Sequence, residues 1–112
     1  MRWNMTGVTV AGTSVAGGAA NQLSQPWNLF VDINKNLYIA VAANHRIQFW
    51  SFGASSGTII AGSTGAWGSA SNRFDMPSDV FVDANANFYV ADRMNNRIQF
   101  FRNSTTNGIT VY

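Results

Sequence analysis

The side chains that could do chemistry in this sequence are few and far apart. His45 is the only histidine, and the chain contains no cysteine. A zinc site in a single chain needs several His, Cys or carboxylate ligands, so we expect His45 to have a structural role in a turn. The sequence has no Gly-x-Ser-x-Gly motif and no glycine-rich loop ending in lysine. These residues therefore predict no catalytic site, no cofactor and no metal.

The composition favours a strand-rich protein with a nearly neutral surface. Charged residues make up 11% of the chain, and abundant Asn, Ser, Thr and Gly replace them. Such residues are poor helix formers, which favours strands and turns. The net charge is only +2 and the basic residues form no cluster. A nucleic-acid-binding surface usually shows such a cluster, and none is predicted here.

The amino-terminal segment carries no recognisable targeting signal. It lacks the apolar run of a signal peptide, and no stretch of about 18 apolar residues could span a membrane. We therefore expect no membrane partner. The sequence does not assign a compartment.

An internal repeat dominates the sequence. NHRIQFW at residues 44–50 returns as NNRIQFF at residues 95–101. Residues 21–61 laid over residues 72–112 share many identical positions without a gap, and the shift of 51 residues (72 minus 21) lies in the range of propeller repeats. The chain therefore contains two copies of one structural unit.

Each copy reads as four short strands separated by turn residues. The runs are rich in Val, Ile, Phe and Tyr, as strands are. Asp32 and Asp83 each open a predicted hairpin turn, and Asn34 and Asn85 are expected to take its left-handed position. The predicted strands are 28–32, 36–41, 46–52 and 57–61 in the first copy, and 79–83, 87–92, 97–102 and 108–112 in the second.

The start of the chain adds one more strand. GVTVAG at residues 7–12 is similar to GTIIAG at residues 57–62, which contains a predicted fourth strand. We divide the chain into an outer strand and linker at residues 1–20, a first unit at 21–71 and a second unit at 72–112. Both ends fall inside a unit, as in a segment cut from a longer array.

The repeated run resembles the NHL repeat. Both NQLSQPWNLFVDINKNLYIAVAANHRIQFW and NRFDMPSDVFVDANANFYVADRMNNRIQFF are similar to that family's motif, and the second fits better. The resemblance covers nearly the whole chain. It implies four-stranded blades in a β-propeller that usually has six. The motif positions kept here are Asn44, Arg46, Asp92, Asn95 and Arg97.

One pair in this motif could suggest catalysis. Asp92 ends a predicted strand and Arg97 opens the next, so an acid and an anion-binding group would face each other across a turn. We expect a structural hydrogen-bonded pair instead. Val41 stands where the family has Asp, which leaves Arg46 without this partner.

Four further residues are candidate binding residues. Asn28 and Asp79 begin the first strand of each unit, which is nearest the axis of a propeller, and three copies of Asp79 could hold a cation there. The simpler interpretation is that both replace a turn glycine. Trp27 and Trp67 lie in predicted connections, where exposed aromatic side chains serve recognition.

Two blades are too few to bury their own apolar faces. Stacked repeats generally need at least three units, and closed propellers have 4–8 blades. We therefore expect the chain to associate with copies of itself. A homotrimer would give the six blades usual in the family, while a dimer or tetramer would give four or eight. Residues 7–11 of one copy are expected to complete the second blade of its neighbour, in competition with that neighbour's shorter tail at residues 109–112. The alternative is that the amino-terminal segment folds against its own chain or frays.

The expected function is a non-enzymatic propeller scaffold or binding module, formed by self-association of a natural fragment or an engineered chain. The first alternative is a propeller that binds single-stranded RNA or a protein, as many NHL propellers do. A less favoured alternative is an enzyme similar to the amidating lyases of NHL-like propellers, which bind zinc through several histidines. A single histidine argues against that chemistry.

Overall fold

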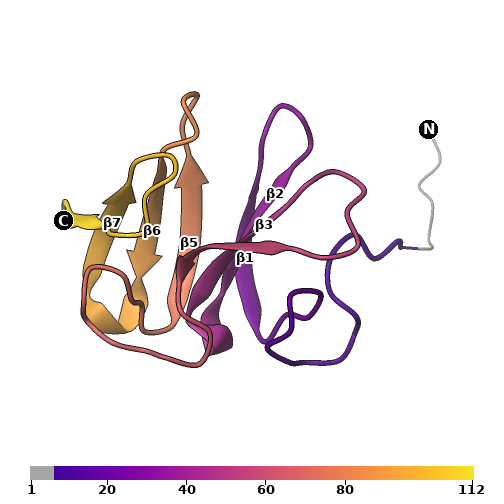
Figure 1. The fold of residues 1–112 in the computed structure, drawn as a ribbon, viewed down its shortest axis with the longest axis horizontal. Coiled ribbons are helices and arrows are strands. Elements are labelled where there is room, and N and C mark those ends of the chain that lie inside the picture. Colours follow the sequence, from indigo (N-terminus) through magenta and orange to yellow (C-terminus); the bar gives the residue numbers. More distant parts are fainter. Residues whose placement is uncertain (1–6) are drawn as a thin grey trace.

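A computed structural model describes residues 7–112 and shows an all-β fold (Figure 1). Two four-stranded antiparallel sheets follow one another, in the orders β1-β2-β3-β4 and β5-β6-β7-β8. The predicted all-β class and the two four-stranded units are confirmed. The strands are β1 Pro26–Val31, β2 Leu37–Val41, β3 Arg46–Trp50, β4 Thr58–Gly62, β5 Pro77–Val82, β6 Phe88–Asp92, β7 Arg97–Phe101 and β8 Ile109–Thr110.

The two sheets stand side by side along the longest dimension of the molecule. The principal extents are 45 × 30 × 22 Å. The described start of the chain and the carboxyl terminus lie at opposite ends of this long axis (Figure 1). Each sheet therefore has one face toward its neighbour and one face toward an end of the molecule.

An aspartate closes the first hairpin of each sheet. Asp32 Oδ1 accepts hydrogen bonds from the backbone N–H groups of Asn34 and Asn36, at 2.9 Å each. Asp83 accepts the equivalent bonds in the second sheet. The predicted turns opened by Asp are confirmed, because the carboxylate satisfies two backbone donors that the ladder leaves free.

The left-handed residue of each turn is not the predicted one. Lys35 and Ala86 have φ angles of 66° and 62°, whereas we expected Asn34 and Asn85 in this role. The carboxylate of Asp32 fixes the N–H group of Asn34, so the following residue makes the left-handed step. This conformation costs a residue with a Cβ atom about 1–2 kcal/mol.

Some strand ends also differ from the prediction. Pro26 and Pro77 are the first residues of β1 and β5, and each stands beside a register irregularity where a missing N–H group does no harm. β8 is shorter than predicted. Residues 7–11 form no strand in the single chain, and residues 1–6 of the predicted outer strand and linker lie outside the described residues.

The main hydrophobic core lies between the two sheets. Val80 and Val82 of β5 are buried in it, together with Phe74 from the preceding linker. From the first sheet, alternate positions on three strands point into this core. They are Phe30, Tyr38, Ala40, Ile47 and Phe49. This packing joins the two sheets into one unit.

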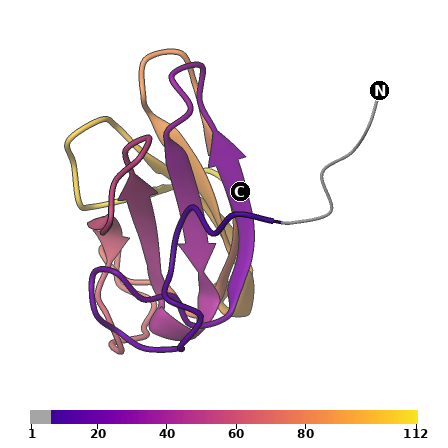
Figure 2. The same ribbon diagram turned by 90° about the vertical axis from the view of Figure 1, so that its right-hand side faces the viewer.

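A second, smaller cluster covers the opposite side of the first sheet. Ile39, Val41 and Trp50 are buried there, with Ala11 and Leu23 packed against them. Trp50 therefore lies on the side of the first sheet that is turned away from the second sheet, where the amino-terminal segment partly covers it. Figure 2 looks onto this side, where the indigo segment crosses only part of the sheet.

We predict a large loss of stability for Gly62→Ala. Gly62 has a φ angle of +83°, and an added Cβ atom would overlap the carbonyl oxygen of His45 and lie 2.9 Å from the Cα atom of Arg46. Gly65→Ala is the matched control, because φ is +71° and nothing lies within 4 Å of the added atom. In urea denaturation, Gly65→Ala should cost about 1–2 kcal/mol. Gly62→Ala should cost about 1–3 kcal/mol more. Equal losses would contradict the close contact.

Candidate functional site

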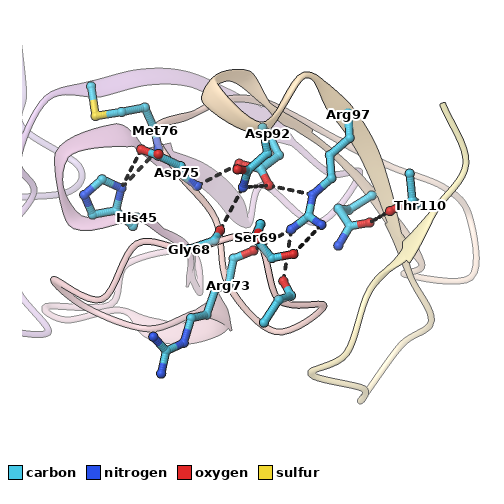
Figure 3. A network of polar contacts seen from close by, with 12 residues as sticks. His45, Gly68, Ser69, Arg73, Asp75, Met76, Asp92, Arg97 and Thr110 are labelled. Carbon is cyan, nitrogen blue, oxygen red and sulfur yellow. Dashed lines mark hydrogen bonds and ion pairs between the residues drawn. The ribbon is translucent and has the colours of Figure 1, made fainter.

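A buried carboxylate organises the end of the second sheet (Figure 3). Asp92 is fully buried, and its Oδ2 atom accepts hydrogen bonds from Arg97 Nε at 2.9 Å and Asn95 Nδ2 at 2.8 Å. Its Oδ1 atom accepts the backbone N–H of Asp75 at 2.8 Å. The expected pairing of Asp92 with Arg97 is confirmed. All three donors belong to the protein, so this carboxylate has a structural role.

Arg97 connects the sheet to the linker that precedes it. Its terminal nitrogens donate to the backbone carbonyl oxygens of Ser69, Ala70 and Arg73 at 2.8–3.0 Å. Asn95 Nδ2 also donates to the carbonyl oxygen of Gly68 at 2.7 Å. The guanidinium of Arg97 is therefore occupied by backbone carbonyl groups and is not available to an anion.

The first sheet repeats this arrangement without the carboxylate. Arg46 donates to the carbonyl oxygens of Gly18, Ala19 and Gln22. Val41 occupies the position of Asp92, and the buried Nε atom of Arg46 has no hydrogen-bond partner among residues 7–112. Burial without a counter-ion lowers the pKa of Arg46. The prediction that Arg46 lacks an acidic partner is confirmed.

Asn44 completes the comparison between the sheets. Its Nδ2 atom donates to the carbonyl oxygen of Gly17 at 2.9 Å, as Asn95 does to Gly68. The five motif residues singled out in the sequence therefore do one task. They fasten each sheet to the linker before it.

His45 is part of the connection between the sheets. Its backbone is left-handed, with φ of 55°, and it ends the short 3₁₀ turn η1 (Ala42–Asn44). Its Nδ1 atom accepts the backbone N–H of Met76 at 3.0 Å and lies 4.0 Å from Asp75 Oδ1 (Figure 3). The expected structural role in a turn is what this geometry supports.

The two tryptophans considered for binding have different partners. Trp27, which is half exposed, lies under the guanidinium of Arg93, 4.6 Å from ring centroid to Cζ. Arg93 opens the 3₁₀ turn η2 (Arg93–Asn95), so this contact joins the two sheets. Trp67 is exposed on one side, and its ring centroid lies 5.8 Å from that of His45. Both rings help to fix the connection between the units.

Asn28 and Asp79 occupy equivalent positions at the start of the sheets. Both are exposed, and each Oδ1 atom accepts the backbone N–H of the next residue at 2.8 Å. Each lies beside the register irregularity that follows the strand-opening proline. Each of these hydrogen bonds therefore stabilises a local bend at the start of its strand.

Two of the hollows in the described structure lie at places that the sequence did not single out. One, of about 380 Å³, lies between the sheets beside Tyr38, Phe49 and Phe88. The other, of about 510 Å³, lies beside Val10 and Leu37. Leu37 aligns with Phe88 in the repeat. The two hollows therefore lie at equivalent positions, on the same side of each sheet. Neither is lined by a residue singled out in the sequence, because the candidates came from the repeat motif, the strand starts and the tryptophans of predicted connections.

Within residues 7–112, no three His, Cys, Asp or Glu side chains are grouped closely enough to hold a metal ion. In the same range, no helix is long and apolar enough to span a membrane.

Comparisons with known proteins add no assignment. No model of a known protein family matches the chain, and the comparison with curated proteins gives no significant match. Function must therefore be inferred from the chain's own geometry and from its repeat.

We predict that Asp92→Val strongly destabilises the fold, although Val stands at the same position of the first sheet. The substitution removes the acceptor of Arg97, Asn95 and a backbone N–H group. Breaking such a buried pair costs about 3–5 kcal/mol.

Asp79→Asn is the matched control for this prediction. It also replaces an aspartate of the second sheet by the residue of the first, but the site is exposed and Oδ1 remains an acceptor. Its effect in urea denaturation should stay within about 0.5 kcal/mol. An Asp92→Val chain as stable as the control would show that the network does not hold the linker.

Proposed function

We propose that the chain is a non-enzymatic β-propeller scaffold that is completed by association with copies of itself. Each copy would supply two blades, and the second sheet of one copy would pack on the first sheet of the next. The packing between the two sheets within the chain is the pattern for this contact.

A repeated apolar surface is the observation that carries the proposal. The five core residues of the first sheet, Phe30, Tyr38, Ala40, Ile47 and Phe49, pack against the second sheet. The repeat places identical residues at the same positions of the second sheet, where they face away from the core. They are Phe81, Tyr89, Ala91, Ile98 and Phe100, which we call the outer face of the second sheet.

The outer face of the second sheet is only partly covered in the single chain, because Ala91, Ile98 and Phe100 are half-buried while Phe81 and Tyr89 are exposed. Phe81 is 58% exposed and Tyr89 is 37% exposed, whereas Tyr38, the equivalent of Tyr89, is 8% exposed. A contiguous apolar surface of this kind marks an interaction site. Since the same five residues bind a sheet within the chain, a second copy of such a sheet is the partner that fits.

The complementary surface lies at the other end of the molecule. Val80 and Val82 are buried against the first sheet, at 3% and 5% exposure. Their equivalents, Leu29 and Val31, are each 50% exposed. One copy can therefore present Leu29 and Val31 to the outer face of the second sheet in the next. Covering both surfaces would remove apolar area from water.

The two surfaces lie at opposite ends of the long axis, so the contact is head to tail (Figure 1). Head-to-tail contacts form a ring if the rotation closes and a fibre if it does not. The resemblance to NHL repeats favours six blades, and hence a homotrimer. In this proposal the protein is a member of that family, and its task is to build a propeller on which ligands can bind.

The described residues do not favour the RNA-binding alternative. Arg46 is fully buried and donates to four acceptors, and Arg97 is used by Asp92 and three carbonyl groups. Neither guanidinium is free to neutralise phosphates, which supply most of the affinity for nucleic acids.

We predict that Ala91→Arg converts the assembly into single chains. Ala40, the equivalent residue, is fully buried between the sheets, so a large charged side chain at residue 91 would block docking. It removes no packing inside the chain. Light scattering should give the mass of one 12.2 kDa chain for this variant and a multiple of it for the unmodified chain.

Ile33→Arg is the control for this experiment. Ile33 is 97% exposed in a hairpin turn, and its equivalent Ala84 stays exposed although the second sheet is packed on the first, so the substitution should leave the mass unchanged. An unmodified chain that remains single at all concentrations would overturn the proposed function. An assembly that tolerates Ala91→Arg would assign the contact to another surface.

A further inference from the structure

The amino-terminal linker already has the shape of the linker between the sheets. Ser14 and Gln25 have φ angles of 69° and 52°, and their equivalents Gly65 and Met76 have 71° and 54°. A left-handed backbone at Ser14 or Gln25 is costly for a residue with a side chain. Residues 12–25 thus keep a costly conformation although the described residues before them form no sheet.

In the linker between the sheets, this backbone conformation is accompanied by contacts with the end of the first sheet. The N–H group of Gly65 donates to the carbonyl oxygen of Asn44, and that of Met76 donates to His45 Nδ1 at 3.0 Å. Asn96 has the position of His45 in the second sheet and has the same left-handed backbone, with φ of 53°. Its amide oxygen can accept as Nδ1 of His45 does. The matching donor would be Gln25 of a docked copy.

The last strand of a sheet needs small residues where it passes the next sheet. Ala61 is only 2% exposed in the core between the sheets, and Gly62 has no room for a Cβ atom. Residues 7–12 provide the same pair, Ala11 and Gly12. Residues 108–112 instead place Tyr112 at the position of Ala61, where its side chain is 85% exposed.

Tyr112 therefore stands where a docked copy must pack. Its backbone pairs with Ile98, since Ile98 N–H donates to the carbonyl oxygen of Tyr112 at 2.8 Å. Ile98 belongs to the outer face of the second sheet. A tyrosine beside it cannot fit the space that an alanine fills between the two sheets of the chain.

We propose that a docking copy inserts its residues 7–12 beside β7 of its neighbour and displaces that neighbour's residues 108–112. This inference rests on the proposed self-association, and it names the segment and register of the contact. The register follows from the repeat. Gln48 pairs with Ile59 within the first sheet, so Gln99 would pair with Thr9 of the docked copy. The exchange breaks the two residue pairs of β8 and the two backbone hydrogen bonds that join Ile98 to Val111 and Tyr112, and the incoming strand can make the equivalent bonds.

Because the chain contains no cysteine, disulfide trapping can test this register. The Thr9→Cys/Gln99→Cys variant should form disulfides between chains, visible as multiples of the chain mass on a non-reducing gel. The matched variant Gln99→Cys/Thr110→Cys contains the pair that is opposed in the single chain. It should form an internal disulfide only when dilution has separated the copies.

Light scattering of the same samples distinguishes the two levels of the proposal. A multi-chain mass with Thr9–Gln99 disulfides supports strand exchange. A multi-chain mass in which only the internal Gln99–Thr110 disulfide forms overturns the exchange and leaves self-association intact. A single-chain mass at every concentration overturns both.

Hydrogen exchange on the unmodified chain gives a second readout that needs no substitution at Gln99. The N–H group of Val111 donates to the carbonyl oxygen of Ile98 at 3.0 Å in the single chain. As concentration rises and copies assemble, this amide should lose protection while amides 8–11 gain it. Assembly that leaves both segments unchanged would contradict the exchange.

Discussion

The packing of one sheet face on another is the interaction on which the whole structure depends. Each sheet is apolar on both sides, as expected for a sheet that has a neighbouring sheet on each face. A chain with two such sheets can make one complete contact, in which Tyr38, Ala40 and Ile47 are buried. The same residues recur on the outer face of the second sheet, where no other sheet of the described residues packs on them. The outer side of the first sheet is partly covered, because the amino-terminal segment packs over Trp50 and Val41. This difference between the ends gives the molecule its direction.

The repeat also shows which polar contacts are indispensable and which are not. Both sheets use an arginine at the start of the third strand to hold three linker carbonyl groups. Only the second adds a carboxylate. The linker of the first sheet keeps its place with an uncompensated guanidinium, so the carbonyl contacts suffice for geometry. Since a buried cation without an acid is costly, the carboxylate contributes stability more than shape.

Much of the fold could be predicted from the sequence, because the repeat supplies each pattern twice. The strands, the turns opened by Asp32 and Asp83, and the pairing of Asp92 with Arg97 all follow from alternation and spacing. The left-handed residues at Lys35 and Ala86 could not be predicted, because side-chain bonds within the turn decide them. The cover that the amino-terminal segment gives to Trp50 could not be predicted either, because that segment has no periodic pattern. The docking surfaces could not be predicted from the sequence. The two sheets have identical residues at equivalent positions, and only the structure shows which of the two is buried.

The most direct test of the account is sedimentation of the unmodified chain over a wide range of concentration. A closed ring of two-bladed chains predicts a mass that rises from 12.2 kDa and then stays constant at a small whole multiple, three being the number that gives six blades. Growth without limit would show that the head-to-tail contact forms but does not close. A compact particle of one chain at the highest concentrations would contradict the central claim, because it would mean that these apolar faces are stable in water without a partner.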